Sequence, residues 1–318
     1  RAGPSSFIPQ DSFSRKFGRL PGECVPIDSA PEDTSRPHFP PQPEYDLLWF
    51  IAHHAPELEG WERDIFLAVR EESFYFYPVF ACQIMNEGWA SYWHSKILTE
   101  KIMNDSEVID FADRHSGTMA MSPMGFNPYK VGIELFRNIE ERWNKGRFGT
   151  EWDNCKDGAE RENWDKNLGL GKEKVFEVRK LYNDVVAIME FFTPDFCEKY
   201  EFFEWKKYPN GEYKIESKDP AKIKAKLVSR YMNGGLPDIR LVDPNHKGKG
   251  MMLLQHAWTG RELHDSYVGP VLEALRKLWK KDVYLATRSK GGDEIVYRCR
   301  GDQCMVDLVT RGFGEAAA

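Results

Sequence analysis

The chain has 318 residues, 41% hydrophobic and 14% aromatic, so it can bury a sizeable core and does not have the composition of a disordered protein. Its net charge is −6 and no basic stripe stands out, which argues against a nucleic-acid partner. No apolar run is long enough for a membrane-spanning helix, and six scattered cysteines favour a reducing, cytoplasmic location.

The N-terminal part divides into a leader and a helical region. Residues 1–43 are rich in Pro and Ser and lack periodicity, which indicates an extended leader or linker. From residue 44 to 193 apolar residues recur at helical spacing. The predicted helices are 44–55, stopped by Pro56; 57–77, broken by Pro78; 79–103; 106–117, with Ser106 as N-cap; 130–146, closed by Gly146; and 172–192, ended by Pro194.

After Pro194 the period shifts toward two residues, which indicates strands. The strand-like segments are 200–208, 212–217, 238–243, 250–258, 282–289 and 293–300, and the predicted helices are 219–235 and 261–281. The PNG and KGG sequences are hairpin turns. The fold class is therefore α+β, with a mainly α-helical bundle over 44–193 and a smaller antiparallel α+β domain over 194–318. Cys299 and Cys304 are read as two ordinary thiols.

The sequence QIMNEGWASYWH, residues 83–94, carries polar side chains on a helix that is otherwise apolar nearly all round. Glu87 and His94 lie within about 20° of each other on a helical wheel, because seven residues make nearly two turns. Ser91 lies between them and Asn86 at their boundary. We call these four residues the polar stripe. Burial of a carboxylate without a partner is costly, so the stripe must face other polar groups, a metal, a ligand or water.

A metal held by Glu87 and His94 alone is disfavoured, since their Cα atoms would be about 10.5 Å apart and ligand pairs on one helix favour i,i+3 or i,i+4. Other helices would have to add ligands, as in helical-bundle metal sites. The further candidates are His53, His54, His115, Glu71 and Glu72, of which His115 and His54 are preferred. The alternative is that the polar stripe forms a hydrogen-bonded network that fixes the helix register.

A second feature is GFNPYKVG, residues 125–132. Asn before Pro initiates a turn, and Pro at the first helical position is typical of a helix start. The segment is therefore read first as a helix cap. The functional alternative is a loop that presents Asn127 and Tyr129 toward the polar stripe.

The strings FIAHHAPELEGWERDIFLAVREESFYFYP, QIMNEGWASYWH and NPYKVGIELFRNIEERW closely resemble the SpoVR-like family, the stage V sporulation protein R proteins. The segments GMMLLQHAWTGRELHDSYV and LRKLWKKDVYLATR extend the resemblance, which covers about residues 40–300. It implies a role in forming the spore cortex or in a related stress or cell-envelope process. The family's upstream segment of the form HVxGHxDFF does not stand in this sequence.

The resemblance leaves two functions open. EGWA is similar to the third-ligand helix of some glutamate zincins, which implies that Glu87 is a metal ligand and that two histidine ligands come from outside this sequence. The first function is then a metal-dependent hydrolase in which Glu87 binds the metal, zinc being the first choice, His94 and His115 bind it or orient a ligand, and Asn86 positions them. Its substrate would be cell-wall material or a protein partner. In the alternative, the chain is a non-enzymatic scaffold or regulatory protein whose polar stripe is structural.

Overall fold

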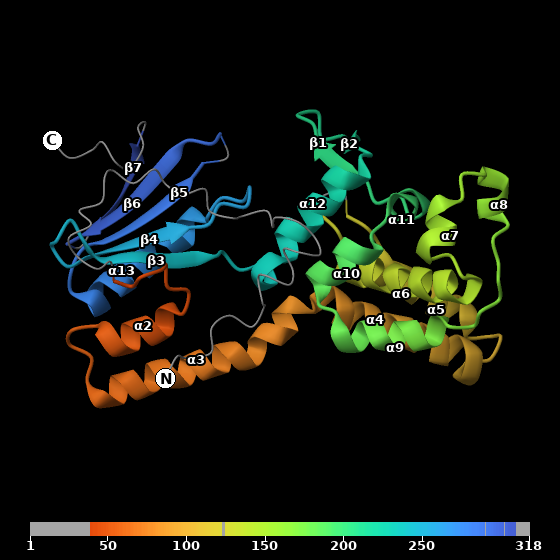
Figure 1. Ribbon diagram of the computed structural model, residues 1–318, viewed down its shortest axis with the longest axis horizontal. Helices are drawn as coiled ribbons and strands as arrows, with labels where there is room; N and C mark the ends of the chain where they lie inside the picture. The colour runs from red at the N-terminus through yellow and green to blue at the C-terminus, as the bar shows by residue number, and fades with distance from the viewer. Residues whose placement is uncertain (1–38, 123–124, 290, 302, 310–318) are drawn as a thin grey trace. The chain divides into compact units, whose positions relative to one another are not determined.

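The computed structural model describes residues 39–122, 125–289, 291–301 and 303–309 (Figure 1). The chain forms two compact units, one from residues 77–235 and the other from residues 1–76 together with 236–318. We call them the helical unit and the sheet unit. Most of the predicted leader, residues 1–38, lies outside the described residues. No helix in the described ranges is long and apolar enough to cross a membrane.

The helical unit is built from α-helices and one hairpin. Its helices are α4 (Gln83–Ile97), the π-helix η1 (Leu98–Ile102), α5 (Val108–Met119), α6 (Pro128–Lys145), α7 (Gly149–Asn154), α8 (Gly158–Glu162), α9 (Gly171–Leu181), α10 (Asp184–Phe191), α11 (Pro194–Lys199) and α12 (Pro220–Tyr231), followed by the 3-10 turn η2 (Met232–Gly235). The predicted hairpin is confirmed as β1 (Glu204–Lys207) paired antiparallel with β2 (Tyr213–Ser217). The predicted end of α6 at Gly146 is also confirmed, with Gly146 left-handed at φ 68°.

Three details of the helix prediction are wrong. Pro78 lies inside α3 (Gly60–Ala81), and the break comes instead at Cys82, whose φ of −128° and ψ of 32° are not helical. Ser106 does not cap α5, because its hydroxyl donates to the Asn104 side chain at 2.5 Å. The helix predicted over 172–192 is two helices, since the Asn183 side chain accepts from the backbone N–H of Val186 at 3.0 Å and caps α10.

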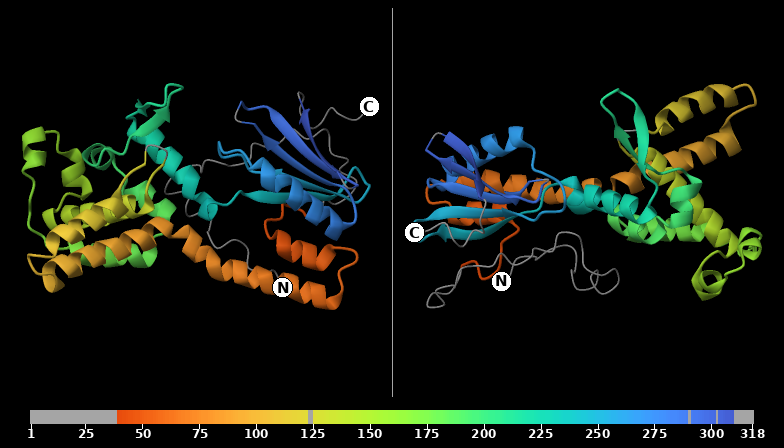
Figure 2. Two further views of the ribbon diagram at one scale, coloured as in Figure 1. Left: turned by 180° about the vertical axis from the view of Figure 1, so that it is seen from behind. Right: turned by 90° about the horizontal axis from the view of Figure 1, so that it is seen from above.

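The core of the helical unit forms where α4 and α6 lie side by side (Figures 1 and 2). A Cβ added at Gly88 would lie 2.4 Å from the Cα of Gly132, so the two backbones are in direct contact. Farther along, Lys96 Nζ lies 2.5 Å from Glu140 Oε1. From the first contact to the second, the residue number increases by eight in both helices, so α4 and α6 run in the same direction. Two glycines facing each other permit this close approach, because neither has a side chain to separate the backbones.

The sheet unit holds α2 (Leu47–His54), most of α3, and a five-stranded sheet with α13 (Asp265–Trp279) on one face (Figure 2). Its strands, in spatial order, are β3 (Ile239–His246), β4 (Met251–His256), β5 (Val283–Arg288), β6 (Glu294–Arg300) and β7 (Gln303–Val309). The α+β class is confirmed. The sheet is mixed rather than purely antiparallel, because α13 connects β4 to β5 as a crossover and the two strands pair in parallel. β7 was not predicted.

Cys299 lies on β6 and is disulfide-bonded. Cys304 is the residue opposite it in the register of β6 and β7. The expectation of two ordinary thiols is therefore wrong for Cys299. Disulfides persist in oxidising compartments, so cysteine usage does not by itself support the predicted cytoplasmic location, which stays a prediction.

Candidate functional site

The start of α4 is fixed by a carboxylate that lies about a hundred residues away in the sequence. Asp184, fully buried at the start of α10, accepts from the backbone N–H groups of Ile84 and Met85, each at 2.9 Å. Cys82, at the N-cap position, makes no side-chain cap of its own. Asp184 therefore does for α4 what an N-cap residue normally does. Burial raises the pKa of Asp184 to about 6, and the backbone N–H groups, which act in the opposite direction, do not overcome it.

The first residues of the polar stripe have partners on other helices. The guanidinium of Arg179, on α9, donates to Asn86 Oδ1 at 2.9 Å. It also lies over the ring of Trp89, 6.0 Å from the centroid. The Tyr129 hydroxyl, on α6, faces the Glu87 carboxylate, and its interaction with that carboxylate raises the pKa of Tyr129. Asn86 and Glu87 thus connect α4 to α9 and α6.

Asn127 is occupied as a helix cap. Its Oδ1 accepts from the backbone N–H of Tyr129 at 2.9 Å, and its amide nitrogen donates to the carbonyls of Thr118 and Ala120 at 2.7 and 3.0 Å. Asn127 therefore closes the loop between α5 and α6. Of the two candidates in this loop, Tyr129 is the one that contacts the polar stripe.

His94 and His115 both contact the ring of Phe111. His94 is exposed, and its ring centroid is 5.9 Å from that of Phe111. Phe111 stacks on His115 at 5.2 Å and 20°. Burial lowers the pKa of His115, helped by the charges of Arg137 and His94. In the described part of the chain, the buried Nε2 atom of His115 has no hydrogen-bond partner.

Three charged residues of α6 were missed by the sequence prediction. Glu134 is only 5% exposed, and its Oε1 accepts from Lys130 at 2.8 Å and from Arg137 at 3.3 Å. All three act electrostatically on His115. Their i,i+4 and i,i+3 spacing is a readable signal, but the same pattern is typical of a solvated helix face and says nothing of burial.

His54 lies on α2 in the sheet unit, whereas Glu87, His94 and His115 belong to the helical unit. Its ring packs against Phe50 at 4.4 Å and Phe39 at 5.4 Å. Burial lowers the pKa of His54, and the neighbouring His53 lowers it further. These contacts make His54 part of an aromatic cluster of its own unit.

The residues present do not fit a metal ion by themselves. Within the described ranges, no group of three or more His, Cys, Asp or Glu side chains could hold one. Glu87 interacts with Tyr129, and His94 is exposed and contacts Phe111. A metal at the polar stripe would need ligands from outside these ranges, so we derive no chemical step through it.

Comparison with known sequences decides the family. The sequence model described as "SpoVR like protein" matches residues 22–236, and the one described as "SpoVR-like C-terminal domain" matches residues 237–290. The chain belongs to the SpoVR-like family. The division between the two matches falls next to residue 235, where the helical unit ends. The SpoVR-like part thus contains the whole helical unit with the polar stripe.

A curated relative of this SpoVR-like chain is the "Uncharacterized protein YcgB" of Escherichia coli (strain K12). It is 28% identical over 283 residues, which cover 82% of this chain and 53% of the relative. The chain therefore spans about half the length of the curated relative it matches. No solved structure matches.

Proposed function

We propose that this SpoVR-like chain is a non-enzymatic scaffold or regulatory protein in the process for which the family is named, formation of the spore cortex, or in a related cell-envelope process. The observation that carries the proposal is that Asn86 accepts a hydrogen bond from Arg179 on α9 at 2.9 Å, while Glu87 interacts with Tyr129 on α6. A polar stripe with such partners stabilises one arrangement of the helices. A partner would then bind to the surface of the protein outside the polar stripe.

The network connects α4 to three other helices. Asp184 holds its first turn from α10, Arg179 holds Asn86 from α9, and Tyr129 holds Glu87 from α6. Buried polar groups with partners in fixed geometry favour one packing over others. A catalytic carboxylate or imidazole, by contrast, must have an atom directed at a substrate. Asn86 Oδ1 and the Glu87 carboxylate face side chains of other helices instead, which favours the scaffold.

The second candidate is a metal-dependent hydrolase, favoured by the buried Nε2 of His115 without a hydrogen-bond partner among the described residues. An imidazole nitrogen of this kind can bind a divalent metal. Glu87, His94 and His115 would be the ligands supplied by this chain, with zinc as the metal, which would act as a Lewis acid. This candidate requires further ligands to join these three residues.

Elemental analysis of the protein purified without chelator separates the two candidates. The scaffold predicts that the metal content, whatever it is, is unchanged within error by Glu87→Gln. Glu100→Gln is the matched control, since Glu100 is exposed on the π-helix that follows α4. Near-stoichiometric zinc in the wild type and the control that disappears in Glu87→Gln would overturn the scaffold proposal and favour the hydrolase.

A further inference from the structure

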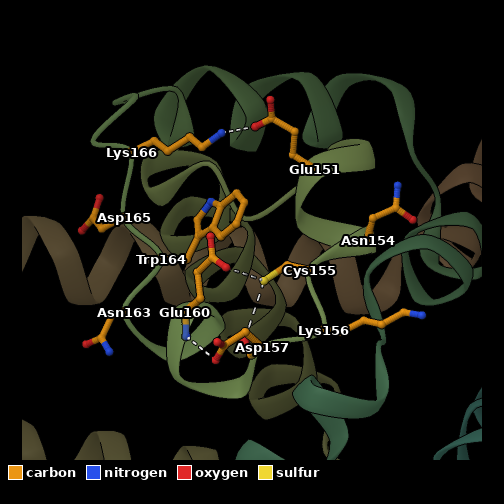
Figure 3. A pocket seen from close by; sticks show the side chains of 10 residues that line it. All are labelled: Glu151, Asn154, Cys155, Lys156, Asp157, Glu160, Asn163, Trp164, Asp165 and Lys166. Carbon is orange, nitrogen blue, oxygen red and sulfur yellow. Dashed lines mark hydrogen bonds and ion pairs between the residues drawn. The ribbon is translucent and has the colours of Figure 1, made fainter.

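A cavity of about 780 Å³ lies beside α7, α8 and the segment that follows them to Lys166 (Figure 3). It belongs to the helical unit and shares no lining residue with the polar stripe. Trp164 lies at its centre in this view, with carboxylates of Glu151 and Glu160 on two sides.

Trp164 is held in place from two sides. Its indole Nε1 donates to the carbonyl of Gly146 at 3.0 Å. The ring of Trp152 meets it edge-on, with centroids 5.5 Å apart and planes at 78°. A tryptophan fixed in this way presents its ring at a constant position, as a binding surface requires.

Glu160 is oriented by the thiol of Cys155, whose Sγ lies 3.5 Å from Glu160 Oε2. Asp157 is occupied as the N-cap of α8, because its Oδ1 accepts from the backbone N–H groups of Ala159 and Glu160. Asp165 is occupied in a similar way, since its Oδ1 accepts from the backbone N–H of Asn167 at 2.9 Å. Glu160 and Glu151 are therefore the carboxylates with which a ligand would interact.

Lys166 shows which chemistry the cavity accommodates. Its ammonium lies 4.8 Å from the centroid of the Trp164 ring and forms an ion pair with Glu151. An ammonium between an aromatic face and a carboxylate is the arrangement by which proteins bind cationic amines. The side chain of Lys166 is 44% exposed, so it can leave this position for solvent.

The side chains that line the cavity carry an excess of negative charge, with the guanidinium groups of Arg147 and Arg161 behind them on the backbone carbonyls of Trp164 and Cys155. Four carboxylates line it, against two lysines: Glu151, Asp157, Glu160 and Asp165, with Lys156 and Lys166. A concave surface with an excess of one charge raises the local concentration of the opposite charge. The Trp164 ring, which is held in place, defines where in the cavity a bound cation would lie.

We propose that this cavity binds the ammonium group of an amine ligand. The ammonium takes the place of Lys166 over the Trp164 ring and pairs with Glu151 and Glu160. No covalent step is involved. The amine belongs to a free small molecule or to a lysine side chain, two sources with the same recognition chemistry.

Titration of the whole chain with cadaverine, followed by the indole N–H resonance of Trp164, tests the proposal. The resonance is assigned by its loss in Trp164→Phe. We expect saturable shifts, binding about tenfold weaker in Glu160→Gln, and little change in Glu162→Gln. Glu162 is the matched control, because it lies on the same α8 helix and is exposed but does not line the cavity.

Lys166→Ala gives a test of opposite sign. Removal of the competing ammonium should tighten cadaverine binding several-fold, because the position over the Trp164 ring is then no longer occupied by Lys166. Nα-acetyl-lysine amide, titrated in the same way, tells whether a single lysine side chain is enough or a free diamine is preferred. Equal shifts with uncharged 1,5-pentanediol, equal effects of Glu160→Gln and Glu162→Gln, or no saturable shift in any variant would overturn the proposal.

Discussion

Gly88→Ala is expected to lower the free energy of unfolding of the helical unit by about 3 kcal/mol or more. The new Cβ would lie 2.4 Å from the Cα and 2.5 Å from the carbonyl carbon of Gly132. These are backbone atoms, so no side chain can rotate away and α4 must move from α6. The corresponding loss in melting temperature is about 10 °C for a unit of this size. Thermal unfolding followed by circular dichroism measures it.

Gly117→Ala is the matched control, because Gly117 also lies inside a helix, α5, and nothing lies within 4 Å of an added Cβ. Alanine favours the helix, so this variant should gain up to about 1 kcal/mol. Gly132→Ala should behave like Gly88→Ala, since its Cβ would lie 2.4 Å from the carbonyl oxygen of Ile84. A Gly88→Ala protein that melts within a degree or two of the wild type would show that α4 and α6 are not in backbone contact.

Asp184→Ala is expected to cost about 3 kcal/mol, because two backbone N–H groups at the start of α4 lose their acceptor in a buried position. Asp184→Asn should cost less, since the amide oxygen still accepts one of the two bonds and the buried charge is gone. Urea unfolding at pH 7 gives both values. Equal losses for the two variants would contradict this account of the cap.

The pH dependence follows from the same carboxylate. Its pKa is about 6 in the folded chain and 3.8 in the unfolded chain, so between these values the folded state binds more protons. The unfolding free energy contributed by Asp184 therefore rises as pH falls from about 6 to about 4, by up to about 3 kcal/mol. Asp184→Asn lacks this contribution. The stability difference between wild type and Asp184→Asn should thus increase in favour of the wild type at pH 4.5 relative to pH 7, and a constant difference would contradict it.

The helices were predictable because apolar spacing reports which face of a segment is buried. The boundaries were less so, since they depend on single contacts. Pro78 was expected to break a helix, but a proline removes one N–H and α3 continues for three residues beyond it. The division between α9 and α10 depends on one side-chain bond of Asn183. The parallel pairing of β4 and β5 follows from the path of α13, which local sequence does not specify.

For the candidate site, too, the sequence could predict one part and not another. The helical period placed Asn86, Glu87 and His94 on one stripe and required that it have partners. It could not name Arg179, which is 93 residues away in the sequence from Asn86. Nor could it name Asp184, whose role depends on how α10 packs against the start of α4. Partners at such separations are set by the fold of the whole unit.

The most direct test of the central claim, that the polar stripe is structural, is made in cells that lack the gene for this protein. Complementation is scored by cortex formation, or by survival of envelope stress where the host does not sporulate. Glutamine keeps an oxygen that accepts from Tyr129, so Glu87→Gln should restore the wild-type phenotype, whereas Glu87→Ala should give less soluble protein and partial rescue. A Glu87→Gln protein that is folded and abundant but fails to restore function would contradict the claim.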